Sequence, residues 1–132
     1  MVSSTNIENF LYQQVPAKEN MLLLATCRGL EIIDINSILR VEAISNYSKL
    51  FFADGRSLVV AKILSWFEQK LGGVYFVRVH RGHLVNIRYI KACDYSSGKE
   101  VLLVNNERLT VSRRKKQDFK KAIYQYYGQG FK

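Results

Sequence analysis

The stretch FVRVHRGHLVN, residues 76–86, decides how the fold is interpreted, because four polar or cationic side chains interrupt an otherwise apolar run. Val77 and Val79 are two residues apart and therefore face the same side of a β-strand. Arg81 would take the next inward position, so the alternation fails there, beside a glycine that permits unusual backbone angles. We therefore expect the strand to end near Val79 and residues 80–83 to form a protruding turn, after which the chain returns to the core.

Short runs of apolar, β-branched and aromatic residues on both sides of this turn predict further strands. The runs lie at 21–27, 30–35, 38–44, 49–53, 57–61, 74–79, 89–95, 101–104 and 108–111. Apolar residues at helical spacing predict one helix over 62–71 and a second that begins after Ser112 and ends at Gly128. Because the strands do not alternate with helices, we predict a mainly β fold, mostly antiparallel, with one internal helix and a C-terminal helix.

The length of 132 residues predicts a single domain that can bury its own core. We expect residues 1–20 to be a lead-in segment with a short amphipathic turn at 7–13, residues 21–127 to form the domain, and residues 128–132 to be a tail. No apolar run approaches the roughly 18 residues of a membrane span, and the first twenty residues do not resemble a signal peptide. Cys27 and Cys93 lie far apart, which is typical of reduced, packed thiols, so we predict a cytoplasmic protein.

The excess of positive charge lies in the second part of the chain. Residues 1–77 hold seven Lys or Arg and seven Asp or Glu, whereas residues 78–121 hold twelve and four, a net charge of +8 out of a total of +9. A neutral part joined to a basic part is typical of a protein that binds a polyanion. The composition alone is equally compatible with a soluble protein that has a high isoelectric point and does not bind a polyanion.

The residues give no indication of catalysis or of a cofactor. The chain has no glycine-rich phosphate loop, no G-x-S-x-G motif and no suitably placed pair of carboxylates. His80 and His83 are three apart, so on a strand they would face opposite sides, and no nearby Cys, Asp or Glu completes a tetrahedral set. We therefore expect a protein that is not an enzyme and holds no metal.

Two further polar segments could join the turn at 80–83 along one edge of the molecule. SRRKK, residues 112–116, puts four cations at the start of the last predicted helix, where the helix dipole is already positive. Because this arrangement is locally unfavourable, it indicates an anionic partner such as phosphate. The other segment is SNYSK, residues 45–49, between two predicted strands.

Three stretches together resemble the LytTR family of DNA-binding domains. They are ILRVEAISNYSKLFFADGRSLVV, FVRVHRGHLVN and LTVSRRKKQDFKKAI, in the order and at the spacing typical of that family. The resemblance covers about residues 21–125 and implies an elongated β fold that reads successive major grooves of duplex DNA with loops between its strands. One departure is Gly82, where the family usually has serine, and it removes a hydroxyl from the turn.

Carried over by position, the resemblance implies DNA contacts by the side chains of Asn46, Ser48, Lys49, Arg78, Arg81, Arg114 and Lys115. It also implies that Glu42, His80 and Asn86 hold the turns in place. The implied function is sequence-specific transcription regulation in bacteria, as the effector domain of a two-component response regulator or as a separate regulator. The implied partner is double-stranded DNA with paired sites, with room for a homodimer on DNA and for a receiver or sensor partner in another chain or outside these residues.

A second hypothesis is a non-specific basic β domain that binds RNA, anionic lipid or an acidic protein. The mixture of aromatic and basic residues around 89–95 would suit single-stranded nucleic acid if the rings were exposed. The two hypotheses differ in whether a defined duplex sequence is preferred.

Overall fold

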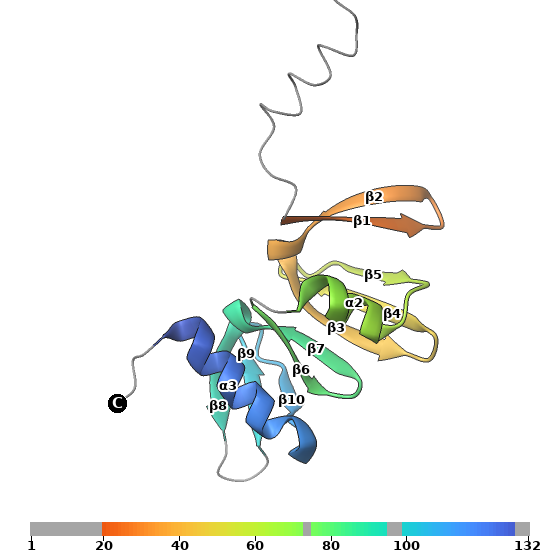
Figure 1. Ribbon diagram of the computed structural model, residues 1–132. Coiled ribbons are helices and arrows are strands. Elements are labelled where there is room, and N and C mark those ends of the chain that lie inside the picture. Colours follow the sequence, from red (N-terminus) through yellow and green to blue (C-terminus); the bar gives the residue numbers. More distant parts are fainter. Residues whose placement is uncertain (1–19, 73–74, 95–98, 129–132) are drawn as a thin grey trace, which may run out of the picture.

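The computed structural model of the chain describes residues 20–72, 75–94 and 99–128 (Figure 1). The amphipathic turn expected at 7–13 and nearly all of the tail expected at 128–132 lie outside the described residues. The division of the chain into 1–20, 21–127 and 128–132 therefore stays a prediction.

The described residues form ten short strands; the apolar runs predict nine of them, and the tenth lies where the chain returns to the core after the turn at 80–83. The strands are β1 (Met21–Thr26), β2 (Gly29–Asp34), β3 (Ile38–Ile44), β4 (Tyr47–Phe52), β5 (Ser57–Val60), β6 (Phe76–His80), β7 (His83–Asn86), β8 (Ile90–Asp94), β9 (Glu100–Leu103) and β10 (Arg108–Thr110). Two α-helices, α2 (Leu64–Leu71) and α3 (Lys116–Tyr127), and three 3-10 turns, η2 (Ile35–Ser37), η3 (Ile87–Tyr89) and η4 (Arg113–Lys115), complete them. The predicted mainly antiparallel β fold with an internal and a C-terminal helix is confirmed.

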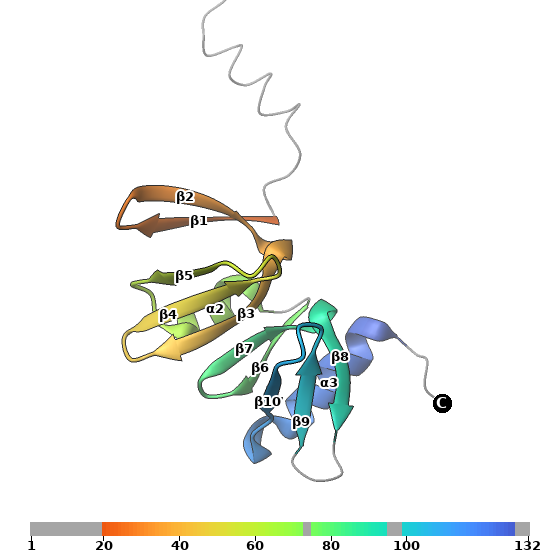
Figure 2. The ribbon, with the colours of Figure 1, turned by 180° about the vertical axis from the view of Figure 1, so that it is seen from behind.

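The strands pair into three antiparallel sheets (Figures 1 and 2). The hairpin of β1 and β2 is one, the order β5-β4-β3-β7-β6 forms the central sheet, and β10-β9-β8 forms the third. In both views the β1–β2 hairpin lies at one end of the molecule and α3 at the other.

The central sheet separates two apolar cores. The first core joins the sheet to α2 and to the inner face of the β1–β2 hairpin, and includes Leu24, Val41, Leu50, Phe67 and Leu84. The second core joins the opposite face to the three-stranded sheet and α3, and includes Val79, Val85, Val101, Leu103 and Phe119. Because each core is closed by a different helix, the sheet is fixed on both faces by burial of apolar surface.

Irregularities in the pairing determine which face some side chains reach. The register shifts between Ile38 and Arg40 on β3 and between Arg78 and His80 on β6. A bulge inserts one residue and moves the side chains that follow to the opposite face. As a result Ile38 and Val41, three residues apart, both belong to the first core, whereas regular alternation would put them on opposite faces.

The structure corrects three local predictions. The internal helix begins at Leu64, two residues later than predicted, because Ile63 is still extended. Gly82 is not among the residues with positive φ, so the turn does not use the conformational freedom of glycine. Cys27 is exposed in the β1–β2 turn and is not packed, whereas Cys93 is half-buried.

Candidate nucleic-acid interface

Three polar turns lie side by side along one edge of the molecule, as both views show (Figures 1 and 2). They are the β3–β4 turn, the β6–β7 turn and η4. The amide of Ala43, at the end of β3, donates to the carbonyl of Gly82 at 2.9 Å, and the amide of Ser112 donates to the carbonyl of Val79 at 2.8 Å. These backbone hydrogen bonds hold the first turn to the second and the second to the third. We call residues 45–49, 81–82 and 112–116 the turn edge.

The β3–β4 turn exposes Asn46 and Tyr47 but not Ser48. Ser45 has a φ of 57°, and the paired residues Ile44 and Tyr47 close a two-residue turn. Ser48 is fully buried, and its hydroxyl donates to the carbonyl of Lys62 at 2.7 Å. The structure therefore argues against the expected DNA contact by Ser48, because its side chain points into the protein and fixes the connection before α2.

Lys49 lies on strand β4, beyond the turn itself. Its side chain is half-buried, and its ammonium lies 5.0 Å from the centre of the Phe51 ring. Glu42 is its partner across the strand pair, so the two side chains share a face of the sheet. Lys49 thus remains available at the rim of the turn edge as a point charge.

In the β6–β7 turn, Arg78 holds the backbone that presents Arg81. Arg78 Nη1 donates to Glu68 Oε1 on α2 at 2.6 Å, its Nε donates to the carbonyl of His80 at 3.2 Å, and its Nη2 donates to the carbonyl of Arg81. Each of the three guanidinium nitrogens therefore has a partner inside the protein, and contact of Arg78 with DNA stays a prediction. Arg81 itself is exposed at the tip.

His80 and Asn86 hold the turns in place, as predicted. The amide of Gly82 donates to Nδ1 of His80 at 3.1 Å, which closes the tip of the β6–β7 turn. Asn86 is fully buried; its Nδ2 donates to the carbonyl of Ile38 and its Oδ1 accepts from the amide of Arg88, each at 2.9 Å. A methyl group at position 82 would meet only His80 Nδ1, at 3.6 Å, so the turn accepts either glycine or the family's serine without a clash.

The third turn presents a cluster of cations. Ser112 caps it, because its hydroxyl accepts from the amide of Lys115 at 3.3 Å. Arg113 and Arg114 are exposed, whereas Lys115 is half-buried. Three of the four cations lie in the 3-10 turn η4 and the fourth, Lys116, is the first residue of α3.

A pocket of about 290 Å³ lies between α2, β6 and the segment where η4 passes into α3. It is lined by Glu68, Gly72, Phe76, Val77, Arg78, Lys115 and Asp118. Two cations and two carboxylates share this lining, so it carries no strong excess of either charge. The pocket shows that Lys115 is placed beside α2 and β6, and not at the tip of η4.

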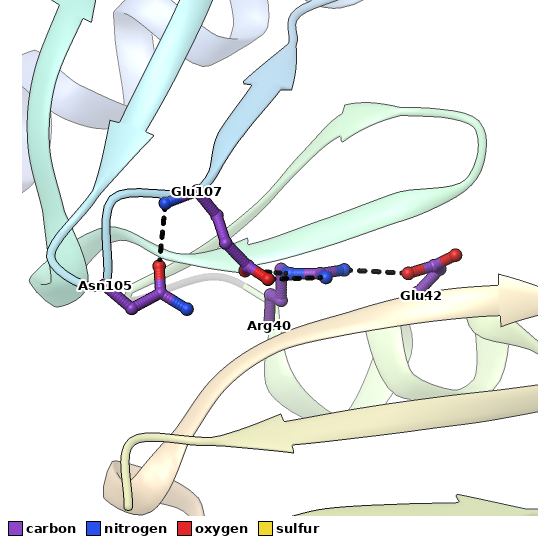
Figure 3. Close-up of polar contacts among 4 residues, drawn as sticks. All are labelled: Arg40, Glu42, Asn105 and Glu107. Atoms are coloured by element: carbon purple, nitrogen blue, oxygen red, sulfur yellow. Dashed lines mark hydrogen bonds and ion pairs between the residues drawn. The ribbon is translucent and has the colours of Figure 1, made fainter. Parts of the chain in front are cut away.

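A buried ion-pair network behind the turn edge was not predicted from the sequence (Figure 3). Arg40 is buried; its Nε donates to Glu107 Oε1 at 2.8 Å, its Nη2 to Glu107 Oε2 at 3.3 Å, and its Nη1 to Glu42 Oε1 at 2.9 Å. Glu107 follows the β9–β10 turn and is positioned by Asn105, whose side-chain oxygen accepts from the Glu107 amide at 3.1 Å. The network therefore joins the central sheet to the three-stranded sheet. A signal for it was present in ILRVEAI, where Arg40 occupies a position within an apolar strand.

Burial and the charges of this network shift the pKa values of Glu107 and His83. The hydrogen bonds from Arg40 are the main cause that lowers the pKa of Glu107, although partial burial opposes the shift. Burial lowers the pKa of the nearby His83; the charges of Arg40 and His80 lower it further, whereas Glu42 and Glu107 raise it. Nδ1 of His83 is buried and has no hydrogen-bond partner among the residues that the structure describes. His83 is therefore favoured in its neutral form between the turn edge and the network.

The described residues contain no group of three or more His, Cys, Asp or Glu side chains that could hold a metal ion. Over the same ranges, no helix has the length and apolar character needed to cross a membrane. What the turn edge does offer is a row of exposed guanidinium and amide groups on fixed backbone, which is the chemistry that recognises phosphate and the edges of bases.

Comparison with known proteins agrees with this chemistry. A family model described as the LytTr DNA-binding domain matches residues 28–124. A solved LytTr DNA-binding domain from Bacillus cereus superposes with a TM-score of 0.67 at 25% identity, covering 85% of this chain and 98% of the solved chain.

Two curated relatives have similar sequences. The transcriptional regulatory protein LytR of Staphylococcus aureus (strain N315) is 32% identical over 62 residues, which cover 46% of this chain and 25% of LytR. The sensory transduction protein LytT of Bacillus subtilis (strain 168) is 26% identical over 114 residues, which cover 85% of this chain and 47% of LytT. The chain thus spans about a quarter to a half of the length of these relatives.

Proposed function

Because the chain belongs to the LytTr DNA-binding domain family, we propose that it binds duplex DNA sequence-specifically and that the turn edge enters the major groove. The family is one of DNA-binding domains and not of enzymes. The observation that carries the proposal is the pair of backbone hydrogen bonds, from Ala43 to Gly82 and from Ser112 to Val79, that align the three turns. A row of turns on one edge can follow one face of a duplex.

Different side chains of the turn edge suit different parts of DNA. Arg81 and Arg114 are exposed and planar, so each can donate two hydrogen bonds to one guanine. Asn46 is exposed in the β3–β4 turn and can pair with adenine through its amide. Lys49 and Lys115 are half-buried point charges at the rim, which suits contact with phosphate.

Ser48 and Arg78 support this surface from within. The hydroxyl of Ser48 is satisfied by the carbonyl of Lys62, and the guanidinium of Arg78 is satisfied by Glu68 and two turn carbonyls. Groups that are already bonded inside the protein would lose those bonds on contacting DNA, which costs free energy. We therefore assign both residues to positioning the turns.

The biological role that we propose is transcription regulation in bacteria. The relatives LytR and LytT are named as a transcriptional regulatory protein and a sensory transduction protein. Because the chain matches only part of each relative, we propose that its input comes from a receiver or sensor partner, in another chain or in a region outside these residues. Two copies on paired DNA sites would present two turn edges to one face of the duplex.

The alternative, non-specific binding of RNA, lipid or an acidic protein, has less support from the aromatic residues. Tyr89 is half-buried, and its hydroxyl donates to the carbonyl of Asn36 at 2.6 Å. A ring held in this way offers little surface for stacking on an unpaired base. Tyr95, the other aromatic residue of that stretch, lies outside the described residues.

A selection from random duplex DNA at near-physiological salt tests the proposal. We expect enrichment of a defined motif, and tighter binding to that motif than to a scrambled duplex or to RNA of the same sequence. Equal, strongly salt-dependent binding to all three nucleic acids would contradict sequence-specific recognition, because it would show that only phosphates are contacted.

A further inference from the structure

Two large apolar side chains lie at the tip of the β3–β4 turn, beside the polar groups of the turn edge. Ile44 ends β3, Tyr47 begins β4, and the two residues pair directly across the turn. Ile44 is 41% exposed and Tyr47 is 50% exposed. Residues directly opposite each other in an antiparallel pair have side chains on the same face of the sheet. We call Ile44 and Tyr47 the tip pair.

The tip pair is not part of the core that the same two strands help to build. The next residues along the strands, Ala43 and Ser48, also pair with each other; Ala43 packs against the first core and Ser48 is fully buried. Because side chains alternate along a strand, the tip pair faces the opposite way. The next pair on its own face, Glu42 and Lys49, is charged. Two apolar side chains beyond a charged pair are therefore not an extension of the core.

The β3–β4 turn, which carries the tip pair, lies in the row of turns that we propose to face DNA, so the inference below rests on that proposed function (Figures 1 and 2). The amide of Ala43 donates to the carbonyl of Gly82 at 2.9 Å, which fixes the tip beside the turn that carries Arg81. Asn46, between the two residues of the tip pair, is exposed. An apolar pair is thus flanked by an amide and a guanidinium on the edge that meets the groove.

We propose that the tip pair recognises the 5-methyl group of thymine in the major groove. The other base edges in this groove present hydrogen-bond donors and acceptors, whereas thymine adds a methyl group that pairs with apolar side chains. Apolar side chains on a fixed backbone match this group, and they leave the polar groups of any other base at that place without a partner. The β3–β4 turn therefore prefers thymine over cytosine, which has a hydrogen at the same carbon.

The size of the tip pair argues against a protein as its partner. Stable interfaces between proteins bury roughly 1,200–2,000 Å² in total. Apolar patches that mark such interfaces usually exceed a few hundred Å². The tip pair consists of two side chains that are about half exposed, with Asn46 between them and the charged Glu42 and Lys49 behind them. A single methyl group requires only a small apolar contact, so it fits this site.

Replacement of single thymines by deoxyuridine in the selected duplex tests the inference, because it removes only the methyl group. At one or more thymine positions the parent protein should lose affinity about fourfold, which corresponds to the ~0.8 kcal/mol of one buried carbon group. The double variant Ile44→Ser/Tyr47→Ser should bind both duplexes equally. Tyr47→Phe should retain the fourfold difference, since it removes only the hydroxyl. An undiminished difference in the double variant, or its loss in Tyr47→Phe, would overturn methyl recognition by the tip pair.

Val104→Ser is the matched control. Val104 is an aliphatic residue that is also 50% exposed, but it follows β9, and its amide donates to the carbonyl of Tyr89 at 2.9 Å. This variant should keep the fourfold difference, and thermal unfolding followed by circular dichroism verifies that every variant is folded. If the selection enriches no motif, the proposed function fails and the inference fails with it. If a motif is enriched but removal of no thymine methyl weakens binding, only the inference fails.

Discussion

Arg78 and Arg81 are three residues apart and have opposite surroundings. Arg81 is exposed at the tip of the β6–β7 turn, whereas the side chain of Arg78 is only 18% exposed and is bonded to Glu68 and to two carbonyls. The same side-chain chemistry therefore serves two purposes in one turn. One guanidinium remains available for a ligand because the other fixes the backbone that carries it.

We predict that substitution of Arg81 or Arg114 affects DNA binding in a different way from substitution of Lys115. Arg81→Ala and Arg114→Ala should each cost roughly 1–3 kcal/mol on the selected duplex and relax preference at one base position, because a bidentate contact to guanine is lost. Lys115→Ala should weaken binding to all duplexes alike and reduce the salt slope by about one, because it removes one phosphate contact.

These variants are compared by titration on a preferred and a scrambled duplex at several salt concentrations. If the arginine variants lost equal affinity on both duplexes, Arg81 and Arg114 would contact only the backbone of DNA. A change of base preference in Lys115→Ala would likewise contradict its assignment to phosphate.

For the positioning role of Arg78, we predict that Arg78→Lys weakens specific binding although it keeps the positive charge. A lysine cannot bond Glu68 and both turn carbonyls at once, so the tip should become less ordered and amide exchange at residues 80–83 should rise. Glu68→Gln should have the same effect in a weaker form, whereas Arg108→Lys, on the three-stranded sheet, serves as control. If Arg78→Lys lowered affinity without changing exchange at the tip, a direct contact with DNA would be the better explanation.

Ser48 and Arg78 show that the sequence can locate a residue in a turn without revealing the hydrogen-bond partners of its side chain. Matching both residues to the family pattern located the turns correctly. It did not show that the hydroxyl of Ser48 bonds the carbonyl of Lys62, or that Arg78 reaches Glu68 on a helix ten residues away. These partners depend on how the connection before α2 and the helix itself pack on the sheet, and local sequence does not encode that packing.

At the scale of elements, the buried Arg40 links two sheets by bonding two carboxylates that are themselves partly exposed. The side chain of Arg40 is 8% exposed, that of Glu42 36% and that of Glu107 37%. Removing one partner of a buried pair leaves the other charge poorly compensated. The β9–β10 turn therefore depends on Glu107 to stay attached to the central sheet.

We predict that Glu107→Gln lowers the free energy of unfolding by roughly 1–3 kcal/mol, because it removes a charged acceptor from a buried arginine. Glu100→Gln is the matched control on the same sheet. Its partner Arg108 lies 3.5 Å away with a side chain 56% exposed, so we expect a loss below about 1 kcal/mol. Urea unfolding followed by circular dichroism measures the free energy of unfolding of both variants. Equal losses would show that the network stabilises the fold no more than a surface ion pair does.

His83 makes the stability of the folded protein depend on pH. Burial, the largest cause, lowers its pKa in the folded protein. The unfolded chain therefore takes up a proton at higher pH than the folded chain. The stability associated with neutral His83 is thus fully present above about pH 6.5, and it is lost as the pH falls from there through the lower pKa of the folded protein.

We predict that the parent protein loses more stability between pH 7.5 and pH 5.5 than His83→Gln does. Urea unfolding at a series of pH values measures the difference, and the range stays above the ordinary pKa of Glu107, so that carboxylate does not contribute. A parallel decline in both proteins would show that His83 is not responsible.

Element order was predictable because each strand carries its own apolar signal and each helix its own period, as in MLLLAT of β1 and the stripe that buries Phe119 in α3. The pairing between distant elements was not. The shift between Ile38 and Arg40 that lets Ile38 and Val41 share the first core arises only when β3 pairs with β4. Exposure of Cys27 likewise follows from a turn that ends β1 one residue earlier than the apolar run.

At the scale of the whole molecule, the three turns lie on one edge, and α3 leads away from the third of them (Figure 1). A protein of this form approaches DNA from one side and leaves the opposite side of the duplex free. Two copies that act together must therefore bind on the same side of the helix if they are to contact each other or a common partner, and DNA repeats its face every 10–10.5 base pairs.

We accordingly predict that joint binding of two copies depends on the helical phase of paired sites. Starting from a duplex with two copies of the selected motif, insertion of 5 base pairs should place the second site on the opposite face and reduce cooperative binding. Insertion of 10 should restore it, because the sites return to the same face. Gel-shift titrations that resolve singly and doubly bound duplex measure the cooperativity, and a duplex with one scrambled motif gives the affinity of a single site. Equal double occupancy at all three spacings would show that the copies bind independently, and the proposal of a homodimer on DNA would then be wrong while recognition of each single site would stand.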